Sequence, residues 1–173
     1  MRLPPVRTWI TLLRSRATYL LAGSYRHFGN KYHLLSEYEH AVEAFGRAID
    51  LDPSFARAYM ERGILYWREI DHPRRAILDL TRAYELDPTL IEARFNRGIA
   101  HQQLCEYNEA VEDFEAYLAQ GDHPHWREYA ESMLRELAEW VNATPDRLTT
   151  AGGTTAPDEP APQGAASGGS RGQ

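Results

Sequence analysis

Apolar residues recur along this chain at intervals of three and four, the spacing that places them on one face of an α-helix. Early in the chain they fall into two runs: Tyr25, Phe28, Tyr32 and Leu35, then Tyr38, Ala41, Val42, Phe45, Ala48 and Ile49. The break between the runs predicts a turn that joins two amphipathic helices. The same arrangement recurs further along, so we expect an all-α protein built from helix pairs.

The helical pattern repeats with a period of 34 to 35 residues. The positions that repeat are three glycines and three alanines: Gly29, Gly63, Gly98, Ala41, Ala76 and Ala110. The glycines are 34 and 35 residues apart and the alanines 35 and 34, so the second unit carries one extra residue in the segment 69–73, which must contain a turn. Segments 48–53 and 83–88 are near copies. A repeat architecture therefore organises the chain.

Local signals mark the ends and the contacts of the helices. Asp52-Pro53 and Asp87-Pro88 are typical of a capping carboxylate followed by proline at the first position of the next helix. The three repeated glycines fall inside predicted helices, where glycine costs about 1 kcal/mol relative to alanine. We expect a close approach of the partner helix's backbone to compensate.

The repeated residues resemble the tetratricopeptide repeat family over about residues 22–122, as three units at 22–55, 56–90 and 91–122. Signature spacings are matched by Tyr25, Phe28, Gly29, Tyr32, Tyr38, Ala41, Phe45, Ala48 and Pro53 in the first unit; by Tyr59, Gly63, Tyr66, Ala76, Leu80, Ala83 and Pro88 in the second; and by Ala93, Gly98, Ala100, Tyr107, Ala110 and Phe114 in the third. The third unit departs from the pattern at His101, Tyr117 and Asp122. The resemblance implies a right-handed superhelix of antiparallel helix pairs, an α-solenoid, whose first helices line a concave face that holds peptides or proteins.

Both ends of the array carry further segments. Residues 123–142 are predicted to form a C-terminal capping helix, with an apolar stripe formed by Trp126, Tyr129, Ala130, Met133, Leu134, Leu137, Trp140 and Val141. Residues 143–173 are rich in Pro, Gly, Ala, Ser and Thr and are expected to be disordered.

Residues 1–21 form a basic amphipathic segment with four arginines and no acidic residue. Its helical stripe consists of Val6, Trp9, Ile10, Leu13, Ala17, Leu20 and Leu21. Three interpretations stay open for this segment: a cap over the first repeat, a helix on an anionic membrane surface, or a docking helix for a partner.

The family geometry implies a set of side chains that line the concave groove: Arg26, Asn30, His33, Arg57, Met60, Ile64, Trp67, Glu92, Phe95, Ile99 and Gln102. The apolar centre of this set suits an amphipathic helix or an extended segment with large apolar side chains. Alternatively, the apolar members pack against neighbouring helices or lie under the N-terminal helix. A subclass of the family grips the carboxylate of chaperone tails, but Glu61, Glu92 and Asn96 replace the residues of that clamp, so we expect no such docking.

Composition narrows the function. Beyond residue 21 the chain has 15 basic and 25 acidic residues, which disfavours nucleic acid as a partner. Cys105 is the one cysteine, which favours a fold without disulfides in the cytoplasm, with membrane contact through residues 1–21 left open. The histidines and carboxylates show no spacing typical of a metal site or a catalytic centre. We therefore expect a non-catalytic adaptor without cofactor or metal that binds a protein or peptide, or alternatively a scaffold attached to a membrane through residues 1–21. Self-association through the terminal faces stays open.

Overall fold

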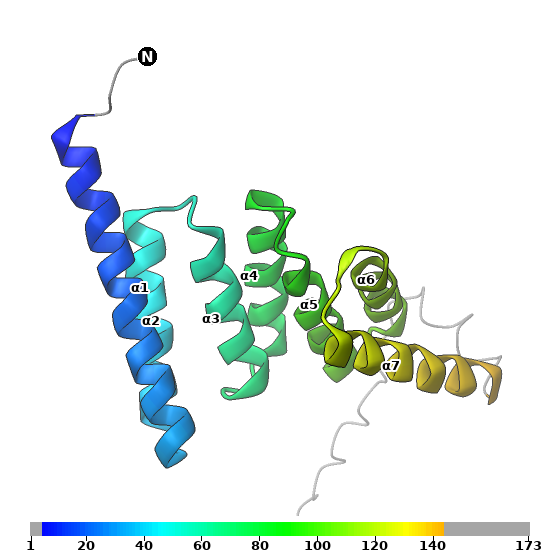
Figure 1. Cartoon of the computed structure of the whole chain (residues 1–173). Helices are drawn as coiled ribbons and strands as arrows, with labels where there is room; N and C mark the ends of the chain where they lie inside the picture. The colour runs from blue at the N-terminus through cyan, green and yellow to red at the C-terminus, as the bar shows by residue number, and fades with distance from the viewer. Residues whose placement is uncertain (1–4, 144–173) are drawn as a thin grey trace, which may run out of the picture. The chain divides into compact units, whose positions relative to one another are not determined.

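The computed structural model describes the backbone of residues 5–143 and the side chains of residues 5–139. Seven α-helices make up this part of the chain: α1 (Val6–Tyr32), α2 (Leu35–Leu51), α3 (Ala56–Arg68), α4 (Pro73–Leu86), α5 (Ile91–Gln103), α6 (Tyr107–Gln120) and α7 (Pro124–Ala143) (Figure 1). No strand occurs among residues 5–143. Residues up to Glu139 belong to one compact unit, which is described below. The all-α prediction is confirmed.

The helices pack as antiparallel pairs, α1 with α2, α3 with α4 and α5 with α6. Successive pairs join through contacts of α2 with α3 and of α4 with α5. Three apolar clusters fill the interfaces, and each contains side chains from the end of one pair and the start of the next. No helix buries its apolar face alone, which is the defining property of a stacked repeat.

The repeated glycines lie where a second helix comes close. A Cβ atom on Gly63 would lie 2.8 Å from Leu80 Cγ and 3.3 Å from the carbonyl oxygen of Ala76. A Cβ on Gly98 would meet the Phe114 ring at 3.0 Å and the Ala110 carbonyl oxygen at 3.3 Å. The expected backbone approach is confirmed at these two crossings, whereas at Gly29 the nearest atoms belong to the Tyr38 ring, at 2.8 Å, and not to a backbone.

The expectation that Asp52-Pro53 and Asp87-Pro88 begin the following helices is wrong. Each following helix starts three residues after the proline. The carboxylate Oδ1 of Asp52 accepts hydrogen bonds from the backbone N–H of Ser54 at 3.2 Å and from its hydroxyl at 2.6 Å, and Asp87 makes the same pair with Thr89. These short-range bonds close a turn between the helices, which explains why the carboxylates do not serve as helix caps.

The terminal segments have different outcomes. The predicted capping helix corresponds to α7, which buries Ala130 and Leu137 in the cluster shared with α5 and α6. Residues 6–21 are not a separate element, because α1 runs without a break from Val6 into the first repeat, and residues 1–4 lie outside the described residues. The predicted disordered segment 143–173 lies outside the described residues except for Ala143, the last residue of α7. Within residues 5–143, no helix is both long and apolar enough to cross a membrane.

Candidate functional site

A pocket of about 220 Å³ is enclosed by side chains from four helices. We call it the groove pocket, and its lining consists of Met60, Ile64 and Arg68 from α3, Glu92, Phe95 and Asn96 from α5, Tyr117 from α6 and Trp126 from α7. Met60, Ile64 and Arg68 follow each other at intervals of four residues and therefore share one face of α3. Glu92 and Asn96 are likewise four residues apart and share one face of α5. The pocket is therefore a product of the stacking of pairs.

Phe95, which lines the groove pocket and is only 1% exposed, is the centre of a cluster of aromatic rings. Its ring centroid lies 5.0 Å from those of Tyr117 and Trp126, 5.6 Å from that of Tyr129 and 5.8 Å from that of Phe114. Trp126 is 38% exposed, and Met60 and Ile64 are half-buried. The pocket thus combines packed aromatic rings with accessible apolar side chains. Burial of this apolar surface by a ligand is favourable, because it removes the surface from water.

The polar groups of the pocket are an arginine, a carboxylate, an amide and a phenol. Arg68 and Glu92 are exposed, whereas Tyr117 is buried. Burial, followed by the negative charges of Glu92 and Asp122, raises the pKa of Tyr117 above its ordinary value of 10.0. The phenol therefore stays neutral at physiological pH, and it adds a hydrogen-bonding group to the pocket without adding a charge.

Four of the predicted groove residues meet in this pocket: Met60, Ile64, Glu92 and Phe95. Three others lie in the packing between helices. Ile99 is buried, the amide nitrogen of Gln102 contacts the sulfur of Met133 at 3.4 Å, and Trp67 packs between two core clusters with its indole nitrogen enclosed by protein.

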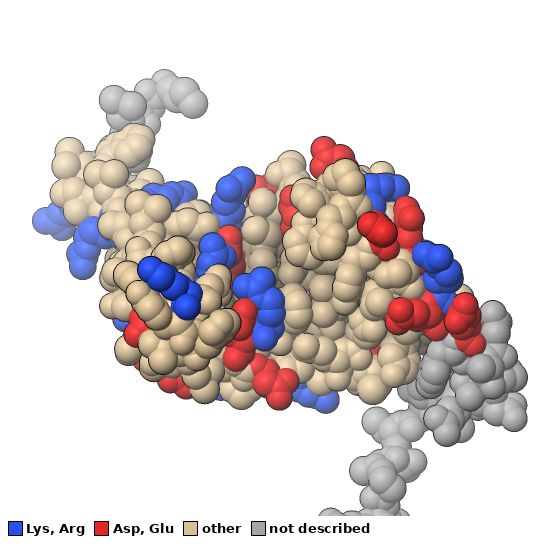
Figure 2. All heavy atoms as spheres, turned by 60° about the horizontal axis from the view of Figure 1, so that its bottom comes forward, with Lys and Arg blue, Asp and Glu red and all other residues tan. Residues whose placement is uncertain are grey.

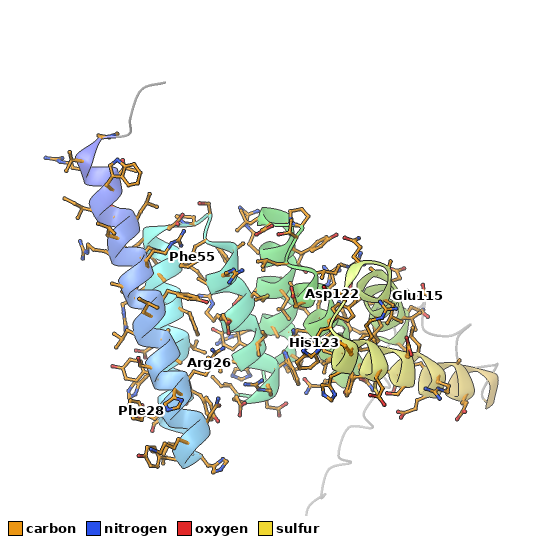
Figure 3. The ribbon with its side chains drawn as sticks, viewed as in Figure 1. Arg26, Phe28, Phe55, Glu115, Asp122 and His123 are labelled. Carbon is orange, nitrogen blue, oxygen red and sulfur yellow. The ribbon has the colours of Figure 1, made fainter. Side chains whose placement is uncertain are left out.

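The remaining predicted residues lie near the N-terminal end. Arg26, which is labelled on α1 in Figure 3, forms an ion pair with Glu61 of α3. The carbonyl oxygen of the Asn30 side chain accepts a hydrogen bond from the Tyr38 hydroxyl at 3.1 Å. His33 ends α1 in the left-handed conformation (φ 53°), and Arg57 is exposed on α3. None of these four side chains lines the groove pocket.

Four lining residues are absent from the predicted groove set: Arg68, Asn96, Tyr117 and Trp126, although the comparison with the chaperone clamp places Asn96 at a ligand-binding position of the family. Trp126 belongs to the apolar stripe of the predicted capping helix, and Tyr117 occupies a position where the third repeat departs from its family. These features were signals that the pocket continues beyond the first helices of the repeats.

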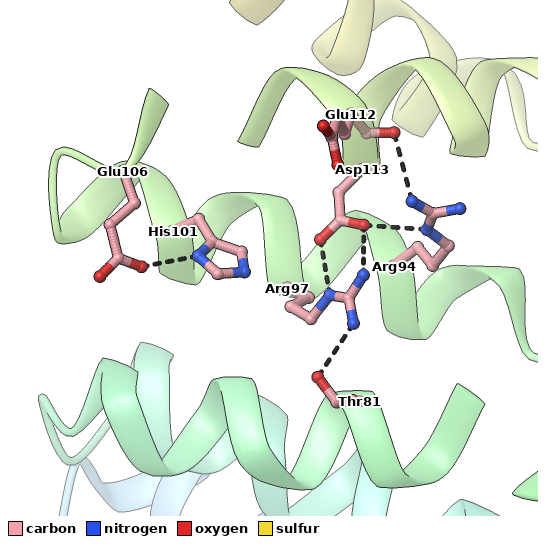
Figure 4. Close-up of polar contacts among 7 residues, drawn as sticks. All are labelled: Thr81, Arg94, Arg97, His101, Glu106, Glu112 and Asp113. Atoms are coloured by element: carbon pink, nitrogen blue, oxygen red, sulfur yellow. Dashed lines mark hydrogen bonds and ion pairs between the residues drawn. The ribbon is translucent and has the colours of Figure 1, made fainter. Parts of the chain in front are cut away.

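A separate polar cluster lies between α5 and α6. Asp113 is buried and accepts hydrogen bonds from Arg94 at 2.8 Å and from two nitrogens of Arg97 at 2.7 Å, while Arg97 also donates to the Thr81 hydroxyl (Figure 4). Hydrogen bonding to Asp113 raises the pKa of Arg97 in spite of its burial. The carboxylate is fully paired, which is typical of a structural role.

Among the described side chains, no three His, Cys, Asp or Glu residues are grouped to hold a metal ion.

Comparison with known proteins agrees with this architecture. The family model described as TPR repeat matches residues 29–69, and the one described as tetratricopeptide repeat matches residues 68–135. No curated protein matches the chain.

Similar solved structures are themselves domains of this kind. The TPR domain of Arabidopsis OM64 is 25% identical, with a TM-score of 0.64 over 73% of this chain and 98% of that domain. The second TPR domain of Spaghetti (RPAP3), bound to the HSP90 peptide SRMEEVD, is 26% identical, with a TM-score of 0.60 over 67% and 99%. The second TPR domain of human RPAP3, in complex with the HSP70 peptide SGPTIEEVD, is 29% identical, with a TM-score of 0.56 over 70% and 98%.

The repeat matches span residues 29–135, and the similar structures cover most of the helical part of the chain. Together with the glycine contacts and the stacked pairs, these findings show that the chain belongs to the tetratricopeptide repeat family.

Proposed function

We propose that this chain is a non-catalytic adaptor that holds a segment of another protein in its groove, with one large apolar side chain seated in the groove pocket. The observation that carries the proposal is the accessible apolar rim, formed by Met60, Ile64 and Trp126, above the packed ring of Phe95. Such a concave apolar site surrounded by a few polar groups is typical of binding hot spots. The cytoplasmic location and the lack of nucleic-acid partners remain predictions.

The size of the groove pocket favours a side chain over a free small molecule. Its volume of about 220 Å³ is below the range of about 300–1,000 Å³ that is typical of small-molecule sites. Arg68, Glu92 and Asn96 at the rim can bind the backbone and polar groups of a peptide on either side of the seated residue. A peptide segment can fill the small pocket with one side chain and bind the polar rim with its backbone.

The ligand chemistry is expected to differ from that of the acidic peptides in the similar complexes. Those peptides, SRMEEVD and SGPTIEEVD, carry three acidic residues at or near their ends. In this chain Arg26 is already paired with Glu61 and Arg68 with Glu69, whereas the carboxylate of Glu92 at the rim of the pocket forms no ion pair with another described residue. An acidic tail would meet like charge there, so we propose a neutral or basic segment with a large apolar residue.

Selection from a phage-displayed library of random peptides against the full chain tests this proposal. We expect the enriched peptides to share an aromatic or large aliphatic residue and to bind, by isothermal titration calorimetry, at least about tenfold tighter than SRMEEVD. Ile64→Glu should weaken the enriched peptides at least about tenfold, because it places a charge against the apolar rim.

Leu78→Glu is the matched control, since Leu78 is a highly exposed apolar residue on α4 that does not line the pocket. This variant should bind the peptides like the native chain. Equal loss in both variants, or preferential binding of SRMEEVD, would contradict the proposal. Because Phe95 is buried, its substitution would test folding and not binding.

A further inference from the structure

The outer face of α1 is apolar and cationic, and the described part of the chain leaves it exposed. The side chains that share this face and are exposed are Val6, Trp9, Ile10, Leu13, Ala17 and Leu20. They follow each other at helical spacing on the side opposite Ser15, whose hydroxyl donates a hydrogen bond to the Ala48 carbonyl oxygen in α2. One side of α1 therefore closes the array, while the other carries apolar surface that no part of residues 5–139 covers.

The charges on this helix have one sign. Residues 1–36 contain six basic residues and no acidic residue, whereas the rest of the chain has 13 basic and 25 acidic residues. Arg16 and Arg26 are paired with Asp52 and Glu61, but Arg7 and Arg14 lie at exposed positions beside the apolar face. Figure 2 shows basic side chains on the protruding N-terminal part of α1 with no acidic side chain among them.

We propose that this outer face of α1 docks on the surface of an anionic lipid membrane. Trp9, Ile10 and Leu13 would enter the boundary between headgroups and acyl chains, where tryptophan is favoured. Arg7 and Arg14 would extend their stems along the apolar region and place their guanidinium groups among the lipid phosphates. The groove pocket lies between α3 and α7, so a partner segment could be held while α1 rests on the membrane.

A second copy of the chain fits this face less well. A symmetric contact between two α1 helices would bring Arg7 and Arg14 of both copies to one seam, with no carboxylate from residues 1–36 to neutralise them. A head-to-tail contact would bring Arg7 and Arg14 to the mainly acidic exposed side of α7, but it would also place Trp9, Ile10 and Leu13 against the charged side chains of that helix, Glu128, Glu131, Arg135 and Glu136. A membrane with anionic lipids supplies both an apolar interior and the complementary charge.

Flotation of the full chain with lipid vesicles tests the proposal. The probe vesicles contain phosphatidylcholine alone or phosphatidylcholine with about 30% phosphatidylserine, since the cytoplasmic leaflet owes its negative potential to such lipids. We expect the chain to float with the anionic vesicles and not with the neutral ones. The double variant Arg7→Gln/Arg14→Gln should lower the partition coefficient about fivefold per arginine removed.

Leu13→Glu should abolish flotation, and the residue is 68% exposed, so the fold should survive, as circular dichroism can verify. Leu78→Glu, at a site 71% exposed on α4, should float like the native chain. Flotation that is unchanged by Leu13→Glu, or no flotation of the native chain, would overturn the proposal. So would a dimer in size-exclusion chromatography with light scattering that Leu13→Glu dissolves. Ile64→Glu should leave flotation intact, which separates this proposal from peptide binding in the groove.

Discussion

Arg97 holds the buried carboxylate of Asp113 by two hydrogen bonds of 2.7 Å, and thereby ties α5 to α6. One repeat earlier, Arg62 grips Asp79 in the same two-pronged way, at 2.7 and 2.8 Å, between α3 and α4. Burial disfavours the charge of Arg62, yet the bonds to Asp79 raise its pKa overall. The ion pair thus recurs at corresponding places in the second and third repeats.

Removal of the carboxylate from this pair should destabilise the chain. Asp113→Ala leaves two half-buried arginines without their common acceptor, and we expect a loss of about 3–5 kcal/mol in the free energy of unfolding. Urea denaturation followed by circular dichroism measures the loss. Glu115→Ala, at an exposed position on the same helix, should change stability by less than about 0.5 kcal/mol. Similar losses in the two variants would show that the pair is unimportant.

Glycine substitutions should have opposite signs at two helical positions. Gly63→Ala places a methyl group 2.8 Å from the buried Leu80 and is expected to cost about 1–3 kcal/mol of stability. Gly23→Ala, in α1, meets no atom within 4 Å and should stabilise the chain by about 0.5–1 kcal/mol through helix propensity. Thermal denaturation of both variants checks the signs. Stabilisation by Gly63→Ala would contradict the close crossing of α3 and α4.

Alkaline pH should destabilise the fold because several tyrosines are buried or half-buried. Desolvation raises the pKa values of Tyr19, Tyr38, Tyr117 and Tyr129 above the ordinary 10.0. These phenols ionise first in the unfolded chain, so their contribution is complete below about pH 10 and is lost as pH rises through the folded-state pKa values. The thermal midpoint should therefore fall above about pH 10, and Tyr117→Phe should make the fall less steep. A midpoint that is independent of alkaline pH would refute this account.

Most of the fold was predictable because the same spacing of apolar, glycine and alanine positions occurs in three successive repeats. Gly63 and Gly98 face carbonyl oxygens of the paired helix. Their regular spacing in the sequence therefore indicates where the two helices of each pair cross. The starts of α3 and α5 were mispredicted because Asp52 and Asp87 bond to the residue two positions later, a choice that sequence spacing does not distinguish from a helix cap.

For the groove, the sequence indicates which side chains share a face of one helix, but not which helices come together. The family geometry implied that Met60 and Ile64 on one helix and Glu92 and Phe95 on another line the groove, and the structure brings these four into one pocket. Trp126 was missed because its place over Phe95 depends on how α7 crosses α5, which follows from packing between distant segments.

The peptide-binding groove can be tested most directly through its methionine. The chain has three methionines, so methyl labelling of methionine with carbon-13 gives a simple NMR spectrum in which Met60 reports the groove pocket and Met133 the packed interface beside Gln102. On titration with a peptide enriched by library selection, the Met60 methyl resonance should shift in proportion to occupancy while that of Met133 stays nearly unchanged. Saturable binding that leaves the Met60 resonance where it was would contradict the proposed site.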